Sequence, residues 1–188
     1  TVVVADSIAT ACTGGFDTHH GAFDFTFDNC KSRDNLASGG TRGNGFSIRG
    51  RLIRLTSCSV DGSSDAYLVF AESNAGSATG QVTLNECSAR NIDRYALYAN
   101  EDAGVTVEGI TLNDCDMESS QHVIYAGAAD VAVNGGRVSP KATWFRPFFT
   151  QNGGSIDGHN IKVFANSKSS ADNSCSTPSS IITNSPRC

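Results

Sequence analysis

The chain has 188 residues, of which 39% are hydrophobic and 18% are charged, and its formal net charge is −5. This composition predicts one globular unit with enough apolar surface for a continuous core. The acidic balance, without a basic stripe, argues against nucleic acid as a partner. No run approaches the roughly 18 apolar residues that cross a membrane, so a membrane partner is not expected either.

The first predicted strand lies in TVVVADSIA, a β-branched run at the start of the sequence. In a fold built from stacked coils, an uncapped first coil exposes an open sheet edge, which promotes aggregation. We therefore expect that the chain is a fragment whose N-terminal part has been removed, or that other chains cover this edge.

The stretch from residue 25 to residue 115 repeats one pattern four times. Each copy ends on a cysteine, with periods of 28, 29 and 28 residues: FTFDNC at Cys30, IRLTSC at Cys58, VTLNEC at Cys87 and ITLNDC at Cys115. Apolar and polar residues alternate within each copy, as in a strand with one buried face. Second strands are expected around Leu68, Leu97 and Ile124, and no segment between the strands has a helical apolar stripe.

A unit of this size cannot bury its own apolar face, so successive copies must stack. The pattern predicts an all-β fold, a right-handed single-stranded parallel β-helix with coils of about 28 residues. We expect it to cover residues 1–164 and to be followed by a polar tail over residues 165–188. Gly136, in a fifth copy that reads VAVNGG, continues the cysteine positions.

Equivalent residues of stacked coils form columns along the axis. The four repeated cysteines are expected to form a ladder of small buried side chains rather than disulfides, because seven cysteines are an odd number. Cys12 stays open, and Cys175 and Cys188 either pair or remain free. Residues Asn85, Asn113 and Asn134 are expected to take a left-handed turn conformation and to hydrogen-bond to one another.

Aligning the ends of the second strands gives a column that is expected to face inward: Thr18, Ile48, Phe70, Tyr98 and Tyr125. In the next columns the first coils carry His19, His20 and Arg49, whereas later coils carry mostly alanine and glycine. This asymmetry points to a site near the first coils. The loop from residue 31 to residue 44, rich in glycine and charge, is either a projecting binding loop or a solvated connection.

Seven residues after three of the cysteines come Asp65, Arg94 and His122, which would form a further column. It is either a stabilising ladder of opposite charges or part of a site. Farther along, the aromatic segment WFRPFF (144–149) cannot all point into one coil. It either caps the helix or forms an exposed patch for a second subunit.

Two segments carry a resemblance to a known family. The first combines a D-T-H-x-G coil with an x-T-x-x-N-C strand, and the second reads G-x-x-I-R-G-R. They resemble the β-helical receptor-binding tailspikes of bacteriophages, which have a pectate-lyase-like fold. The matching positions are Asp17, Thr18, His19, Gly21, Thr26, Asn29, Cys30, Gly45, Ile48, Arg49, Gly50 and Arg51.

This resemblance implies a homotrimer on the tail of a virion, outside the cell, that binds a bacterial surface polysaccharide as the host receptor. It also implies a depolymerase that cleaves the polysaccharide as a glycosidase or a lyase. No set of calcium-binding aspartates can be carried over, so neither a metal site nor a cofactor is expected.

A glycosidase needs two carboxyl groups beside the glycosidic bond. The candidate catalytic pairs are Glu72 with Glu101 and Asp65 with Asp93. In a lyase, a base such as His19 or His20 would instead take a proton next to a sugar carboxylate that Arg49 or Arg51 neutralises.

Candidate substrate-binding residues are Asp17, His20, Arg49, Arg51, Tyr67 and Tyr95. Asp17 and His19 have a structural alternative, a side-chain hydrogen bond that locks one turn. The alternative function is a non-catalytic module, which binds glycan or supports a fibre or a surface adhesin.

Overall fold

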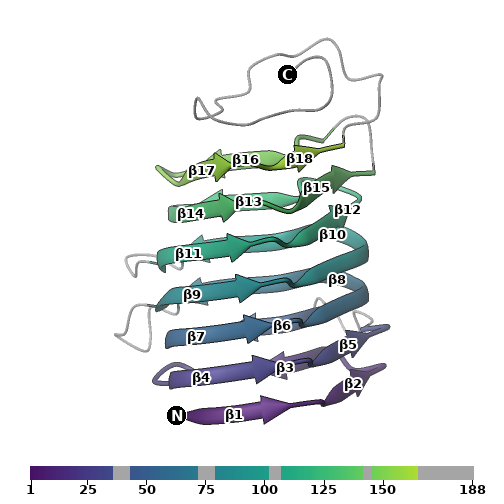
Figure 1. Cartoon of the computed structure of the whole chain (residues 1–188), viewed down its shortest axis with the longest axis vertical. Coiled ribbons are helices and arrows are strands. Elements are labelled where there is room, and N and C mark those ends of the chain that lie inside the picture. Colours follow the sequence, from purple (N-terminus) through teal and green to yellow (C-terminus); the bar gives the residue numbers. More distant parts are fainter. Residues whose placement is uncertain (36–42, 72–78, 102–106, 142–144, 165–188) are drawn as a thin grey trace.

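The structure is a computed structural model that describes residues 1–35, 43–71, 79–101, 107–141 and 145–164, with Glu101 described by its backbone alone. Every regular element in these ranges is a β-strand, and every strand pairing is parallel. The predicted all-β parallel β-helix is therefore confirmed for the described part of the chain (Figure 1). The tail predicted for residues 165–188 lies outside the described residues. No described segment forms a helix that could span a membrane.

One strand of each coil belongs to a seven-stranded sheet, which we call face A. Its strands are β1 (Val2–Ala5), β4 (Phe23–Asp28), β7 (Arg51–Thr56), β9 (Thr79–Asn85), β11 (Val107–Asn113), β14 (Ala129–Asn134) and β17 (Ser155–His159). Phe25, Ile53, Val82 and Ile110 stand in register, so the predicted periods of 28, 29 and 28 residues are confirmed.

The remaining strands form an eleven-stranded sheet that bends into two further faces. Face B contains β2 (Ile8–Thr10), β5 (Lys31–Arg33), β12 (Asp116–Ser119), β15 (Arg137–Pro140) and β18 (Lys162–Val163). Face C contains β3 (Gly14–Asp17), β6 (Asn44–Ile48), β13 (Ile124–Gly127) and β16 (Phe148–Gln151).

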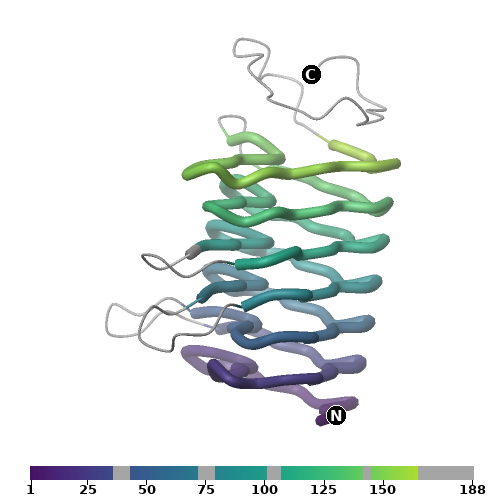
Figure 2. The backbone as a smooth tube through the Cα atoms, turned by 90° about the vertical axis from the view of Figure 1, so that its left-hand side faces the viewer, coloured from purple at the N-terminus to yellow at the C-terminus, as the bar shows by residue number. Residues whose placement is uncertain are grey.

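Two long strands, β8 (Ser59–Ala71) and β10 (Ser88–Glu101), turn the corner between faces B and C. Their first residues pair on face B and their last residues pair on face C. The coils therefore climb as regular layers from the purple N-terminal end, as the view turned by 90° also shows (Figure 2). Of the predicted loop from residue 31 to residue 44, the first residues form β5, and residues 36–42 lie outside the described part.

The core is continuous along the axis because alternate residues of each strand point inward. Leu55, Leu84 and Leu112 form one such buried column on face A. On face C the first coils stack aromatic rings, with centroids 4.8 Å apart for Phe16 and Phe46 and 5.4 Å apart for Phe46 and Tyr67. The same column continues with Leu97 and Ile124 and returns to an aromatic ring at Phe148.

The turn after each face-A strand begins with a residue whose φ is positive, between 49° and 71°. These residues are Asp6, Asn29, Ser57, Glu86, Asp114, Gly135 and Asn160. The prediction that Asn85, Asn113 and Asn134 take this conformation is wrong, because the left-handed residue follows each of them. Their amide ladder is confirmed: Asn113 donates to Asn85 at 2.8 Å and Asn134 donates to Asn113 at 3.0 Å.

The predicted cysteine ladder is also confirmed. Each thiol donates to a main-chain carbonyl of the preceding coil, for example Cys87 to Leu55 at 3.5 Å and Cys115 to Leu84 at 3.4 Å. The five described cysteines form no disulfide. Hydrogen bonding to the neighbouring thiols, together with burial, raises the pKa of Cys87 far above the ordinary thiol value. Cys175 and Cys188 lie outside the described residues.

The column that was expected to face inward is partly wrong. Thr18 and Ile48 are buried as predicted, but β6 and β8 pair Ile48 with Val69 rather than with Phe70. A slip of one residue moves a side chain to the opposite side of a strand. Tyr98 and Tyr125 consequently lie half-buried on the outer side of face C, next to buried alanines.

Candidate functional site

The charged groups of the first coils form a clamp. The guanidinium of Arg49 donates to both carboxylate oxygens of Asp17, at 2.7 and 2.6 Å, and its Nε donates to the carbonyl of Thr18 at 3.0 Å. It also lies 4.9 Å from the ring centroid of Phe70. Arg49 is only 8% exposed, so these contacts tie three coils together. Asp17 thus locks this region through Arg49 rather than through His19.

The other charged candidates near the first coils lie at the surface. His19 and His20 are exposed, with ring centroids 4.3 Å apart. Arg51 lies at the start of β7 on face A, where it pairs with Glu108 at 3.1 Å. The two arginines considered for a lyase are therefore engaged with carboxylates on different faces.

The predicted column of Asp65, Arg94 and His122 is displaced by one residue. Asp65 stands opposite Tyr95, because the register between β8 and β10 shifts between Ile92 and Tyr95. The opposite charges still meet, with Arg94 Nε 3.8 Å from Asp65 Oδ1.

The candidate carboxylate pairs differ in what the structure says of them. Asp65 is completely buried whereas Asp93 is exposed, so these two carboxyl groups do not flank a common cleft and their pairing as catalysts is wrong. Glu72 and the side chain of Glu101 lie outside the described residues, so that pair stays a prediction.

Of the two tyrosines proposed to contact sugar, Tyr67 is wrongly assigned. Its side chain is completely buried, and its single O–H donor lies within hydrogen-bond distance of two carbonyl oxygens, those of Cys58 at 3.0 Å and Ser88 at 2.9 Å. Burial raises the pKa of this phenol well above its ordinary value. Tyr95, in contrast, is half-buried on the outer side of face C.

Tyr95 belongs to a cluster that we call the aromatic strip. Its half-buried rings come from β10, β13 and β16 and from the segments that precede β13 and β16: Tyr95, Tyr98, His122, Tyr125, Phe145 and Phe149. Neighbouring centroids lie 4.4 Å apart for His122 and Phe149, 4.9 Å for Tyr98 and Tyr125, and 5.2 Å for Tyr125 and Phe149. The strip therefore crosses successive coils along the solenoid axis.

The strip also explains the aromatic segment 144–149. Phe148 packs against the core while Phe149, the next residue of β16, faces outward into the strip. Successive side chains of a strand point to opposite faces of the sheet, so the two rings lie on opposite sides of β16. Trp144 lies outside the described residues.

Two polar groups at the strip have defined surroundings. The guanidinium carbon of Arg94 lies 4.8 Å from the ring centroid of Tyr95. His122 Nδ1 accepts a hydrogen bond from the main-chain N–H of Arg146 at 3.1 Å. Burial lowers the pKa of His122 below its ordinary value, so its ring is neutral near pH 7.

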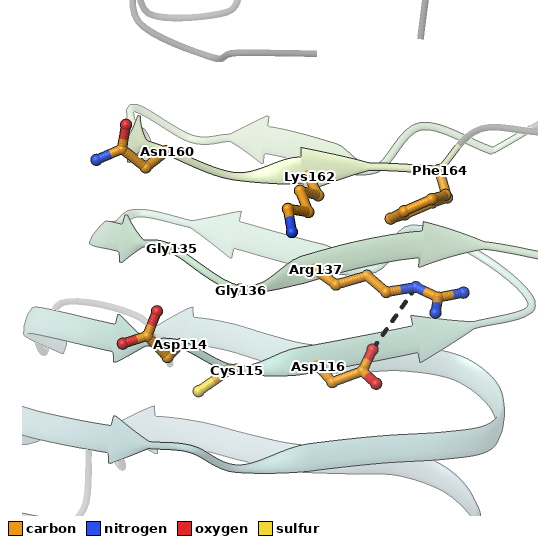
Figure 3. Close-up of a pocket in the computed structure, with 9 residues that line it drawn as sticks. All are labelled: Asp114, Cys115, Asp116, Gly135, Gly136, Arg137, Asn160, Lys162 and Phe164. Carbon is orange, nitrogen blue, oxygen red and sulfur yellow. Dashed lines mark ion pairs between the residues drawn. The ribbon is translucent and has the colours of Figure 1, made fainter. Parts of the chain in front are cut away.

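A separate hollow of about 620 Å³ lies near the last coils, where the chain turns from face A to face B (Figure 3). Its lining consists of Asp114, Cys115, Asp116, Gly135, Gly136, Arg137, Asn160, Lys162 and Phe164. Arg137 pairs with Asp116 at 3.9 Å and covers the ring of Phe164 at 4.4 Å. The hollow has as many acidic as basic side chains, and Arg137 covers the ring of Phe164, its one aromatic side chain. The aromatic strip, which offers several rings, is therefore the better candidate site.

Within the described ranges, no three His, Cys, Asp or Glu side chains gather as metal ligands. No family model, curated protein or solved structure gives a significant match to the chain.

Proposed function

We propose that this chain binds a polysaccharide along the aromatic strip. The observation that supports this proposal is the set of half-buried rings carried by successive coils on the outer side of face C. Sugars combine apolar C–H faces with hydroxyl groups, so they suit a surface that combines ring edges, phenol hydroxyls and a guanidinium. A linear glycan would lie parallel to the solenoid axis and contact several coils at once.

The nature of the glycan follows from the resemblance of the D-T-H and I-R-G-R segments to phage tailspikes. On that basis the ligand is a bacterial surface polysaccharide, and the chain is part of a trimeric virion tail protein. Light scattering on the purified chain tests this assembly, because a homotrimer has three times the 19.7 kDa of one chain. A monomer would remove the support for a tailspike and leave a glycan-binding or structural β-helix.

Binding itself is tested by removing one ring from the strip. We expect Tyr98→Ala to weaken retention on immobilised bacterial polysaccharides by about fivefold, since one aromatic contact contributes about 1 kcal/mol. The matched control is Phe23→Ala, which removes an aromatic ring that is 65% exposed at the start of β4 on face A. Equal losses in the two variants, or no retention of any polysaccharide by the parent chain, would contradict the proposal.

Cleavage of the bound polysaccharide stays a separate prediction. Loss of viscosity of a polysaccharide solution measures it, and Glu72→Gln and Glu101→Gln should abolish it if this pair acts. Binding without loss of viscosity would favour the alternative, a non-catalytic glycan-binding module.

A further inference from the structure

An irregularity in β10 gives one arginine of face C its position. The strands β8 and β10 are in register at Ile92 and again at Tyr95, but two residues of β10, Asp93 and Arg94, stand opposite one residue of β8. A bulge of this kind re-aims side chains and is frequent next to functional sites. Here it places Arg94 beside the aromatic strip.

The guanidinium of Arg94 lies against two rings of the strip. Its central carbon is 4.8 Å from the ring centroid of Tyr95 and 5.9 Å from that of Tyr98. The side chain is 23% exposed, so the cation has lost part of its hydration. Stacking on aromatic rings holds the planar group while its edges remain able to donate.

Within the described part of the chain, the donors of the Arg94 guanidinium find no acceptor at hydrogen-bond distance. The nearest carboxylate, that of the buried Asp65, is 3.8 Å from Nε, which exceeds the reach of about 3.2 Å for a hydrogen bond. Among the described residues, the guanidinium of Arg94 donates no hydrogen bond. Arg49 is different, because its guanidinium binds Asp17 through two hydrogen bonds.

We propose that Arg94 binds the carboxylate of an acidic sugar and thereby makes the aromatic strip selective for acidic polysaccharides. This inference rests on the proposed function of the strip. A planar guanidinium offers two parallel N–H donors that match the two oxygens of a carboxylate. Asp65 approaches the Nε side, which leaves the terminal amino groups for the ligand.

The test compares each bacterial polysaccharide that carries carboxyl groups with the same polysaccharide after chemical reduction of those groups to alcohols. We expect the parent chain to bind the acidic form about tenfold more tightly, a typical value for one charged hydrogen-bonded contact. Arg94→Gln should lower this ratio to about one. Arg94→Lys keeps a cation beside Asp65 and serves as the second variant if Arg94→Gln folds poorly. It should give an intermediate ratio, because lysine lacks the planar pair of donors.

The control is Arg90→Gln, which removes the same charge from face B, where Arg90 is exposed and pairs with Asp116 at 3.4 Å. Its ratio should equal that of the parent chain. Equal binding of acidic and reduced forms by the parent chain would overturn the role of Arg94 while leaving the strip as a neutral-glycan site. An unchanged acid preference in both Arg94 variants would also overturn it. Failure to bind either form would instead refute the proposed function itself.

Discussion

Face A and face C are built from the same coils but differ in how strictly those coils repeat. At the corner after face A, successive coils place an asparagine above an asparagine and a cysteine above a cysteine. On the outer side of face C the column that begins with Ser47 and Leu68 becomes aromatic only at Tyr98, Tyr125 and Phe149, and β10 inserts an extra residue. Identical columns stabilise a solenoid, so the departure from repetition marks the face that is available for recognition.

Substitutions at the corner of face A should therefore reduce stability without affecting binding, and the largest effect is expected at Gly136. Its φ is +78°, and a Cβ added there would lie 2.2 Å from the carbonyl oxygen of Cys115. Because the obstacle is backbone, we expect Gly136→Ala to lower the free energy of unfolding by about 3 kcal/mol or more.

Gly153 provides the matched control for this prediction. Its φ is +83°, but an added Cβ would meet nothing within 4 Å. Gly153→Ala should therefore lower the free energy of unfolding by only about 1 kcal/mol, from backbone strain alone. Similar urea midpoints for the two variants would show that the clash of the added Cβ with the Cys115 carbonyl does not cause the loss of stability.

The next largest effect is expected in the asparagine ladder. Asn113 donates to Asn85 and accepts from Asn134, so Asn113→Ala removes two hydrogen bonds, each of which contributes about 1 kcal/mol. We expect a loss of about 2 kcal/mol in urea unfolding, with polysaccharide binding unchanged. Thr111→Ala on the same strand is the control and should change stability little. If Asn113→Ala lost polysaccharide binding at temperatures where the chain is folded, face A would contribute to recognition as well as to stability, against the prediction.

Repetition made face A predictable from the sequence. A cysteine at the same offset in four copies fixes the register of the strands before it, and the structure places those residues in register. The turn conformation was wrong by one residue because a left-handed position is set by backbone geometry. Asn29, Ser57, Glu86 and Asp114 all take it despite their different side chains.

Face C was less predictable because its register depends on an insertion that period counting does not detect. The shift before Tyr95 displaced the column that contains Asp65 and His122. Tyr67 and Tyr95 were both predicted to contact sugar, although one is buried and the other faces outward. The pairing of Ala99 with Ala126 was the available signal, because small buried residues beside Tyr98 and Tyr125 imply that the tyrosines face outward.

Tyr67 sharpens the comparison, since it lies on face C but points into the core. Tyr67→Phe removes a hydroxyl that lies within hydrogen-bond distance of two carbonyls and keeps the stacked ring. We expect a loss of about 1 kcal/mol in the free energy of unfolding and unchanged polysaccharide binding. Weaker binding without loss of stability would mean that the inner side of face C contributes to recognition.

The smallest effect is expected from the titration of His122. Burial lowers its pKa below the ordinary value of 6.5 and outweighs the hydrogen bond to the Arg146 backbone, which acts in the opposite direction. The unfolded chain therefore binds this proton more readily than the folded chain. The contribution of His122 to stability is complete above about pH 6.5 and decreases as the pH falls from there towards the folded-state pKa.

His122→Phe isolates this contribution because it keeps a ring in the strip and removes the titrating group. Urea midpoints measured at about pH 8 and about pH 5 should fall more for the parent chain than for this variant. The parent chain and the variant differ in no other ionisable group, so the difference between them isolates His122. Protonation of His122 also competes with the hydrogen bond that its Nδ1 accepts from Arg146, so the strip itself should loosen in acid. Equal falls in the two proteins would show that the outer side of face C is as insensitive to pH as the ladders of face A.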